Sequence, residues 1–168
     1  IHRSLVEISR GIEAFRPIFN NEELTISTTP AFASLWLIPR LGSFYEKYPE
    51  FHIRVETSNE AVDLLRNPSV DIAIRCGFRH FPDLCEIFLM EESFHVYSPP
   101  GWSLDRANEF ELINVRWSSP SPASIDWNAW CSMANHEDWL GRSLRREYDD
   151  EHHALQAAIS GHGLVLAS

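Results

Sequence analysis

Small polar side chains stand at three points of the sequence where an apolar run ends. They occur in the segments Thr28-Thr29-Pro30, Thr57-Ser58-Asn59 and Arg75-Cys76-Gly77. Hydroxyls, amides and a guanidinium all donate hydrogen bonds, and a guanidinium holds a carboxylate through two parallel bonds. If the three segments meet in the fold, they are suited to bind a small anion such as a carboxylate.

The first of these segments has a second property that favours an anion. Thr29 followed by Pro30 is typical of a helix start, with Thr29 as the N-cap and Pro30 at the first helical position. Free backbone amides at that terminus and the helix dipole attract negative charge. A purely structural interpretation stays open, in which Thr29 only caps a helix and Arg75 pairs with a neighbouring acid. The convergence of three segments favours the ligand.

Other chemical sites are less well supported by the spacing. Cys76, His80 and Cys85 resemble part of a metal site, but no second Cys/His pair follows at zinc spacing. His152 and His153 are adjacent, and neighbouring helical side chains point about 100° apart, so the pair does not chelate one ion from one face. The sequence contains no G-x-S-x-G, P-loop or G-x-G-x-x-G motif. We therefore expect no catalytic residues, no metal and no cofactor, and a protein that is not an enzyme.

Alternating strands and helices must position the polar segments. Pro39 removes one backbone donor, so the helix that contains it should be kinked or irregular in its first turn. The order of elements predicts parallel pairing with right-handed crossovers, and ligands of such sheets bind beyond the carboxyl ends of the strands. The third strand is almost continuously apolar, which suggests burial on both faces. We expect strands at 24–28, 51–57 and 70–75, and helices at 35–48 and 60–66.

The second half of the sequence continues with shorter elements. Trp127, Trp130 and Met133 lie at helical spacing, and a further helix at 151–160 begins after Asp149-Asp150. The acids suit the start of that helix because of its dipole. The inward side chains of this helix should be Ala154, Leu155, Ala158 and Ile159. We expect strands at 85–90, 94–97, 112–115 and 164–167.

Composition limits the kind of protein. The 168 residues are 44% apolar and 23% charged, which suits one core or two small lobes of a soluble protein. No apolar run approaches the roughly 18 residues of a membrane span. A net charge of −10 repels phosphate, so this chain alone is a poor candidate to bind nucleic acid. Three cysteines without a CxxC pair favour a reducing compartment, and we expect a cytoplasmic protein.

The first residues show the heptad spacing of a coiled coil. The apolar side chains are spaced 4, 3, 4 and 3 apart, and Pro17 ends the pattern. Two interpretations stay open: an amphipathic helix packed on its own domain, or the end of a longer dimerising helix covering 1–19. Because the sequence begins inside this pattern and stops on a strand, we expect it to be a fragment. The proposed dimerisation residues are Ile1, Leu5, Ile8, Ile12 and Phe15.

Two stretches resemble a known family. Residues 24–77, which begin LTISTTPAF and end VDIAIRCG, resemble the effector-binding domain of LysR-type transcriptional regulators. Residues 148–168, YDDEHHALQAAISGHGLVLAS, are similar to a second signature of that family. The AIR-x-G run at 73–77 looks most like the branch of glycine-cleavage and β-lactamase activators. The heptad seam looks like the end of the linker helix that joins a winged helix-turn-helix, which this sequence lacks.

The resemblance implies an α/β fold of two lobes, like the type 2 periplasmic binding proteins, with a ligand cleft between the lobes. Lobe I would cover 24–94 and lobe II 95–168, after the linker-helix end at 1–19. In the family the chain crosses back to complete lobe I. This sequence has no such return segment, so we expect an incomplete lobe I.

The implied function is that of a sensor, which binds an amino-acid-like or carboxylate metabolite and modulates transcription. The protein would form a homodimer or homotetramer, contact DNA only through the absent winged helix-turn-helix, and have no membrane partner. The alternatives are a solute-binding protein of a transport system and a cytosolic enzyme on this fold. The family's ligand positions map onto Thr28, Thr29, Pro30, Ala31, Ser58, Asn59, Arg75, Gly77, Phe78, Trp117 and Asp149.

Overall fold

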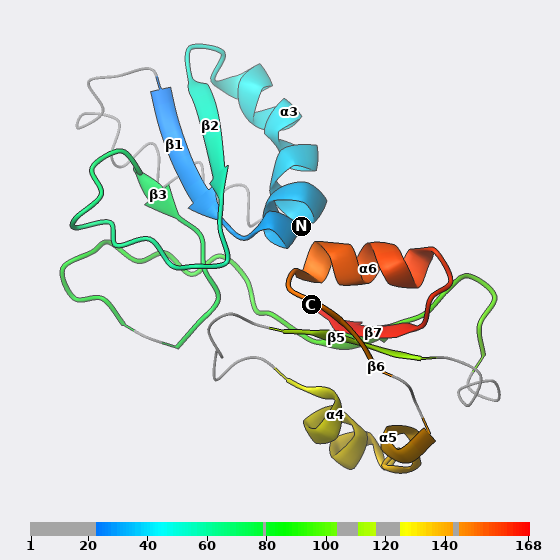
Figure 1. Cartoon of the computed structure of the whole chain (residues 1–168). Helices are drawn as coiled ribbons and strands as arrows, with labels where there is room; N and C mark the ends of the chain where they lie inside the picture. Colours follow the sequence, from blue (N-terminus) through cyan, green and yellow to red (C-terminus); the bar gives the residue numbers. More distant parts are fainter. Residues whose placement is uncertain (1–22, 79, 104–110, 117–124, 143–144) are drawn as a thin grey trace. The chain divides into compact units, whose positions relative to one another are not determined.

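The computed structural model describes residues 23–78, 80–103, 111–116, 125–142 and 145–168. The chain divides into two compact units, one ending at Glu91 and the other running from Glu92 to Ser168 (Figure 1). The lobe boundaries expected at 24–94 and 95–168 stay a prediction. Trp117 and the proposed dimerisation residues Ile1, Leu5, Ile8, Ile12 and Phe15 lie outside the described residues.

A three-stranded parallel sheet forms the centre of the first unit. Its strands are β1 (Glu23–Thr28), β2 (His52–Thr57) and β3 (Ile72–Ala73), in the order β2-β1-β3. Thr28 pairs with Thr57, and Ser27 pairs with Ala73. This arrangement confirms the predicted parallel pairing. Because all three strands run the same way, their carboxyl ends lie at one edge of the sheet.

The third strand is shorter than predicted. Regular pairing covers two residues, although the Asp71 amide donates to the Thr25 carbonyl at 3.0 Å and the Ile74 amide donates to the Ser27 carbonyl at 2.9 Å. Ile72, Ala73 and Ile74 are only partly buried, so the expectation of burial on both faces is wrong. An apolar sequence run shows that side chains avoid water, but neighbouring elements decide how completely they are covered.

One nearly continuous helical segment connects β1 to β2. It consists of α2 (Pro30–Phe32), a π-helical turn η1 (Ala33–Leu37) and α3 (Ile38–Lys47). The Ile38 amide donates to the Ala33 carbonyl, five residues back. Since Pro39 has no N–H, a regular α-helical bond to the Leu35 carbonyl cannot form, and the wider turn precedes it. The predicted irregularity at Pro39 is confirmed.

The core of the first unit lies between the sheet and this helical segment. Leu24 and Ile26 are at most 1% exposed and pack with the buried side chains of α3 and the turn that follows it. Since strand side chains alternate, Thr25 and Ser27 belong to the opposite face. The buried partners of Leu24 and Ile26 are Leu37, Phe44, Tyr48 and Phe51.

Two predicted elements of the first unit are wrong. Residues 60–66 form no helix: Asp63 instead builds a turn, accepting from the Leu65 amide on its side chain and from the Arg66 amide on its carbonyl. Seven residues are too few for a helix that lacks support from tertiary packing, and an aspartate competes locally for backbone amides. Residues 85–90 form no strand, because the described sheet of this unit has the order β2-β1-β3 and does not pair with them.

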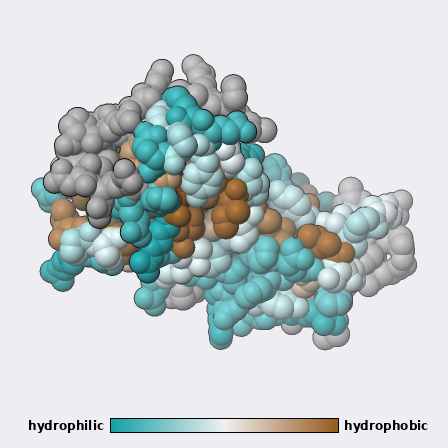
Figure 2. Space-filling view, turned by 90° about the horizontal axis from the view of Figure 1, so that it is seen from above, coloured by the Kyte–Doolittle hydropathy of each residue, from teal (hydrophilic) through white to brown (hydrophobic). Residues whose placement is uncertain are grey.

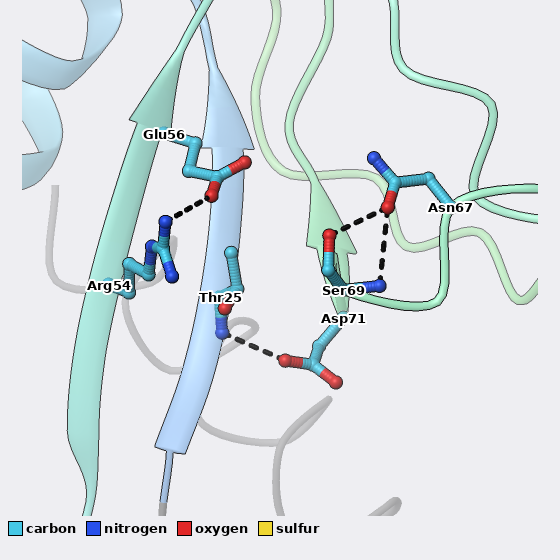
Figure 3. A network of polar contacts seen from close by, with 6 residues as sticks. All are labelled: Thr25, Arg54, Glu56, Asn67, Ser69 and Asp71. Atoms are coloured by element: carbon cyan, nitrogen blue, oxygen red, sulfur yellow. Dashed lines mark hydrogen bonds and ion pairs between the residues drawn. The ribbon is translucent and has the colours of Figure 1, made fainter.

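Polar contacts fix the amino end of β3 against β1 (Figure 3). The Thr25 amide donates to Oδ2 of Asp71 at 2.8 Å, and Thr25 accepts from the Asp71 amide in return. Just before, Oδ1 of Asn67 accepts from both the amide and the hydroxyl of Ser69, at 3.2 and 2.6 Å. The two bonds between Thr25 and Asp71 hold a two-residue strand in register with β1, and the Asn67 bonds shape the turn before it.

The second unit is a sheet with helices on both faces. Its strands are β4 (His95–Tyr97), β5 (Leu112–Val115), β6 (Arg145–Tyr148) and β7 (Leu164–Ala167), in the order β4-β7-β5-β6. β5 is parallel to β6 and β7, and β4 is antiparallel to β7. α6 (Glu151–Ile159) covers one face, and α4 (Trp127–Ala134) with α5 (Asp138–Arg142) covers the other (Figure 1).

Alternation along β5 and β7 explains this three-layer arrangement. Ile113 and Val165 pack with the alanines of α6, whereas Leu112 and Leu164 pack with the tryptophans of α4 and α5. Ile159 is 63% exposed, so its predicted inward position is wrong. The buried positions of α6 are Glu151, Ala154, Ala157 and Ala158. β6 and α5 were not predicted from the sequence; β6 reads Arg-Arg-Glu-Tyr and has no apolar alternation. In the described ranges, no helix has the length and apolar character needed to cross a bilayer.

Candidate functional site

Hydrogen bonds join the end of β1 to the residues that follow β2 and β3, at the carboxyl edge of the first unit's sheet. The Ser58 amide donates to the Thr28 carbonyl at 2.9 Å, and the Thr28 hydroxyl donates to the Ile74 carbonyl at 3.2 Å. The Ser58 hydroxyl then accepts from the Glu60 amide at 3.0 Å. These bonds bring together the ends of β1, β2 and β3, as the parallel topology requires.

Arg75 lies at the centre of this edge. Its Nη2 atom donates to the Ser27 hydroxyl at 2.9 Å and to the Glu60 carbonyl at 3.2 Å, and its Nη1 atom donates to the Ile74 carbonyl at 2.9 Å. Its Nε atom is buried and has no acceptor among the described residues. Burial lowers the pKa of the Arg75 guanidinium below its ordinary value. A guanidinium nevertheless stays protonated in proteins.

Every acceptor described for Arg75 is neutral, and among the described residues no carboxylate forms an ion pair with it. The expectation that Arg75 simply pairs with a neighbouring acid is therefore not met there. A half-buried cation that is stabilised by neutral oxygens alone attracts an anion, because removing a charge from water without an opposite partner costs free energy.

Thr29 has the structural role that its sequence predicts. It is the N-cap of α2, and its hydroxyl accepts from the Phe32 amide at 3.3 Å. Pro30 is the first helical residue, and Ala31 is buried beneath this turn. Among the other predicted residues, Asn59 is half-buried, Gly77 is exposed, and Phe78 is 82% exposed. The contacts described here do not bring Phe78 against Arg75.

The carboxyl end of β6 in the second unit is followed by three acids. Asp149 follows β6 and is exposed, with Oδ1 4.0 Å from Nδ1 of His153. Asp150 is the N-cap of α6 and accepts from the His152 amide at 2.8 Å. Glu151 is buried, and burial raises the pKa of its carboxyl group even though the Ser168 amide donates to it at 2.8 Å. Arg116, which follows β5, adds a cation to this edge, and its Nε atom lies 3.6 Å from Oε1 of Glu147.

The second unit also has a small cavity of about 40 Å³ beside β5 and the start of α4. Trp127 closes it from one side and donates through Nε1 to the Ile113 carbonyl at 2.8 Å. A space of this volume accommodates water-sized groups. Its lining consists of Ile113, Asn114, Val115, Ile125, Asp126, Trp127 and Leu166.

Metal-like residue sets do not assemble in the part of the chain that the structure describes. Within those ranges no group of three or more His, Cys, Asp or Glu residues could hold a metal ion. His80 instead lies 2.6 Å from Glu86, with Nδ1 facing Oε2, and this contact lowers the pKa of the Glu86 carboxyl. Cys76 and Cys85 are both exposed thiols.

Sequence reasoning missed Ser27, Glu60 and Glu151. Ser27 looked like any polar residue of an alternating strand, and Glu60 participates through its backbone carbonyl, which no side-chain pattern reveals. Glu151 carried a weak signal, since it stands at the first position of an alanine-rich helix whose neighbours on that side are buried.

The fold and the polar edge define a class of protein. Its members consist of two α/β units with parallel strands and bind small molecules at polar groups around the strand ends. The chain belongs to the LysR substrate binding domain family, whose model matches residues 20–168. The predicted α/β fold class is thereby confirmed, because the structures similar to this chain are LysR effector-binding domains.

Relatives and solved structures agree with this membership. The chain is 30% identical to the glycine cleavage system transcriptional activator of Escherichia coli strain K12, covering 100% of the chain and 54% of that protein. It is 32% identical to the AhcY transcriptional activator HvrB of Rhodobacter capsulatus, covering 95% and 54%. The effector domain of the transcriptional regulator AmpR of Pseudomonas aeruginosa matches with a TM-score of 0.64 and 25% identity, over 86% of this chain and 69% of that chain. The chain thus spans about half the length of these curated relatives.

Proposed function

We propose that this chain is the sensor part of a transcription regulator and binds a small carboxylate or amino-acid-like metabolite. The observation that carries the proposal is Arg75, a half-buried cation at the carboxyl ends of β1 and β3 whose described acceptors are all neutral. A carboxylate effector supplies the missing negative charge. The names of the relatives, which include activators of glycine cleavage, agree with an amino-acid-like effector.

The site residues divide into three roles in this proposal. Arg75 neutralises the effector carboxylate, while the hydroxyl and amide groups of Ser58 and Asn59 supply further hydrogen bonds. Asp149 of the second unit is suited to an ammonium group, because it is an exposed acid at a strand end. The cleft that the family places between its lobes would also be lined by Thr28, Thr29, Pro30, Ala31, Gly77, Phe78 and Trp117.

Regulation follows from differential affinity. An effector that binds one arrangement of a regulator more tightly shifts the population toward it, and only to the extent of that difference. In this proposal the arrangement controls DNA-binding heads outside this sequence, as part of a cytoplasmic regulator that does not act as an enzyme. The alternative of a transport solute-binding protein receives no support from the relatives, which are transcriptional regulators.

Self-association is part of the same proposal. The outer side of the helix in unit 1 exposes Leu35, Ile38 and Tyr45, which are 48, 53 and 40% exposed. Figure 2 shows hydrophobic areas (brown) that interrupt the hydrophilic surface on the face it displays. In the same unit, β2 is an edge strand of the described sheet and pairs with β1 on one side. These features support side-by-side pairing of two copies through α3 and β2.

Isothermal titration calorimetry with glycine, other amino acids and simple carboxylates tests the proposed function. We expect at least one of these compounds to bind, and Arg75→Ala to weaken that binding at least tenfold. Arg54→Ala is the matched control, because Arg54 lies on exposed β2 and pairs with Glu56 at 3.1 Å. If Arg75→Ala and Thr29→Ala both leave every binding compound unaffected, the proposed pocket is wrong.

A further inference from the structure

We infer that an effector carboxylate reaches Arg75 by displacing the carbonyl of Glu60, and that binding thereby releases residues 59–66 from β3. This inference rests on the proposed function, since it requires an anion at Arg75. It adds a structural consequence of binding: the effector replaces an internal contact and frees a surface segment.

The hydrogen-bonding geometry of Arg75 leads to this exchange. A guanidinium holds a carboxylate through one of two forks, either Nη1 with Nη2 or Nε with Nη2. Both forks need a hydrogen of Nη2. That atom carries two hydrogens, and its two acceptors in the described ranges are the Ser27 hydroxyl at 2.9 Å and the Glu60 carbonyl at 3.2 Å. A bidentate carboxylate must therefore displace one of them.

The two acceptors differ in how easily they can be replaced. Ser27 is 4% exposed, so losing its partner would leave a buried hydroxyl unsatisfied, which is costly. The Glu60 contact is longer and exposed, so water can satisfy that carbonyl after displacement. Displacing Glu60 frees a hydrogen of Nη2 for the carboxylate while the buried Ser27 contact is kept. The exchange thus replaces a neutral acceptor of the guanidinium by a charged one.

Release of Glu60 affects a segment in which the described hydrogen bonds beyond Glu60 are local. Ser58, before it, is fixed by its amide bond to the Thr28 carbonyl. Beyond Glu60, the bonds described for Leu65 and Arg66 end on Asp63, within the segment itself. Exposed amides in locally bonded turns are weakly protected from exchange with solvent. The contact between Arg75 and Glu60 spans 15 residues of chain and joins this segment to the end of β3.

Hydrogen exchange measured by mass spectrometry on the whole chain tests the inference, with glycine and acetate as probes. At saturation we expect amides in 59–66 to exchange about fivefold faster than in the free protein, the loss of one ordinary hydrogen bond. Peptides covering β5 should be unchanged. Glycinamide, which lacks the carboxylate, should have no effect on 59–66.

Two variants complete the test in the absence of any probe. Arg75→Met should raise exchange in 59–66 by a similar factor, whereas Arg54→Met, a matched change on β2, should not. If a carboxylate binds and 59–66 is unchanged or becomes more protected, the inference is wrong while the proposed function stands. Equal acceleration by glycinamide, or by Arg54→Met, also overturns it. If neither glycine nor acetate binds, no carboxylate displaces Glu60 and the inference fails; calorimetry with the wider panel then decides the proposed function separately.

Discussion

The Nη2 atom of Arg75 lies 2.9 Å from the hydroxyl oxygen of Ser27, a residue 48 positions earlier in the chain. Ser27 is on the central strand β1, and Arg75 directly follows the ladder of β3. The contact joins two parallel strands at their carboxyl ends and fixes the plane of the guanidinium. The orientation of the guanidinium depends on a buried neutral hydroxyl. A substitution of Ser27 therefore alters the site without changing the charge of the site.

Replacement of Ser27 by alanine should weaken carboxylate binding about tenfold, which is the effect of removing one hydrogen bond that orients a charged group. Calorimetric titration with the carboxylate that binds the unaltered protein measures the change. Ser43→Ala is the control, since the Ser43 hydroxyl donates to the Arg40 carbonyl on the exposed side of α3. An affinity that is the same in Ser27→Ala and Ser43→Ala would contradict an orienting role for Ser27.

Gly163→Ala should destabilise the second unit by about 2 kcal/mol or more, because strain and a steric clash act together. Gly163 has φ +152°, and a Cβ atom there would overlap the Glu111 carbonyl, next to the bond that the Leu164 amide makes to it. Urea unfolding followed by tryptophan fluorescence measures the loss. Gly42→Ala in α3 is the control, where a Cβ meets nothing within 4 Å and alanine favours the helix by about 1 kcal/mol. Equal stability of the two variants would contradict this prediction.

Glu151 should make the second unit less stable as pH rises. Burial raises the pKa of its carboxyl in the folded state above the unfolded value of about 4.3. Between these two values the folded state binds more protons than the unfolded state, so the free energy of unfolding falls with increasing pH. Thermal unfolding of the unaltered protein and Glu151→Gln, from pH 4 upward, measures this.

We expect the melting temperature of Glu151→Gln minus that of the unaltered protein to increase as pH rises. This difference should become constant above the pKa of Glu151 in the folded state. Glu137→Gln removes an exposed acid of the same unit and should show no such trend. A difference that is constant over the whole range would mean that Glu151 does not titrate differently in the folded state.

Ile38→Asp should weaken self-association at least tenfold, since a charge buried in an apolar contact is costly. Sedimentation velocity at tens of micromolar compares it with Met133→Asp, a change at a 75% exposed apolar residue of α4. We expect the unaltered protein and Met133→Asp to associate equally. A purely monomeric unaltered protein, or equal association of both variants, would contradict pairing through α3.

The sequence alone predicted much of the first unit, because its patterns are local. Alternation identified β1 and β2, Thr29-Pro30 identified the helix start, and Pro39 identified its irregular turn. Residues 60–66 and 85–90 were misjudged, since a short apolar pattern becomes a helix or strand only when a neighbouring element supports it.

For the candidate site, the types and approximate places of the polar groups were determined by the sequence. Parallel topology predicted that Thr28, Ser58 and Arg75 would gather at one edge, and the bonds among Thr28, Ser58 and Ile74 follow that order. Only the tertiary structure decided which atoms Arg75 contacts. Its acceptors are a buried hydroxyl from β1 and a backbone carbonyl from the segment after β2, and such contacts depend on register and turn geometry rather than on residue type.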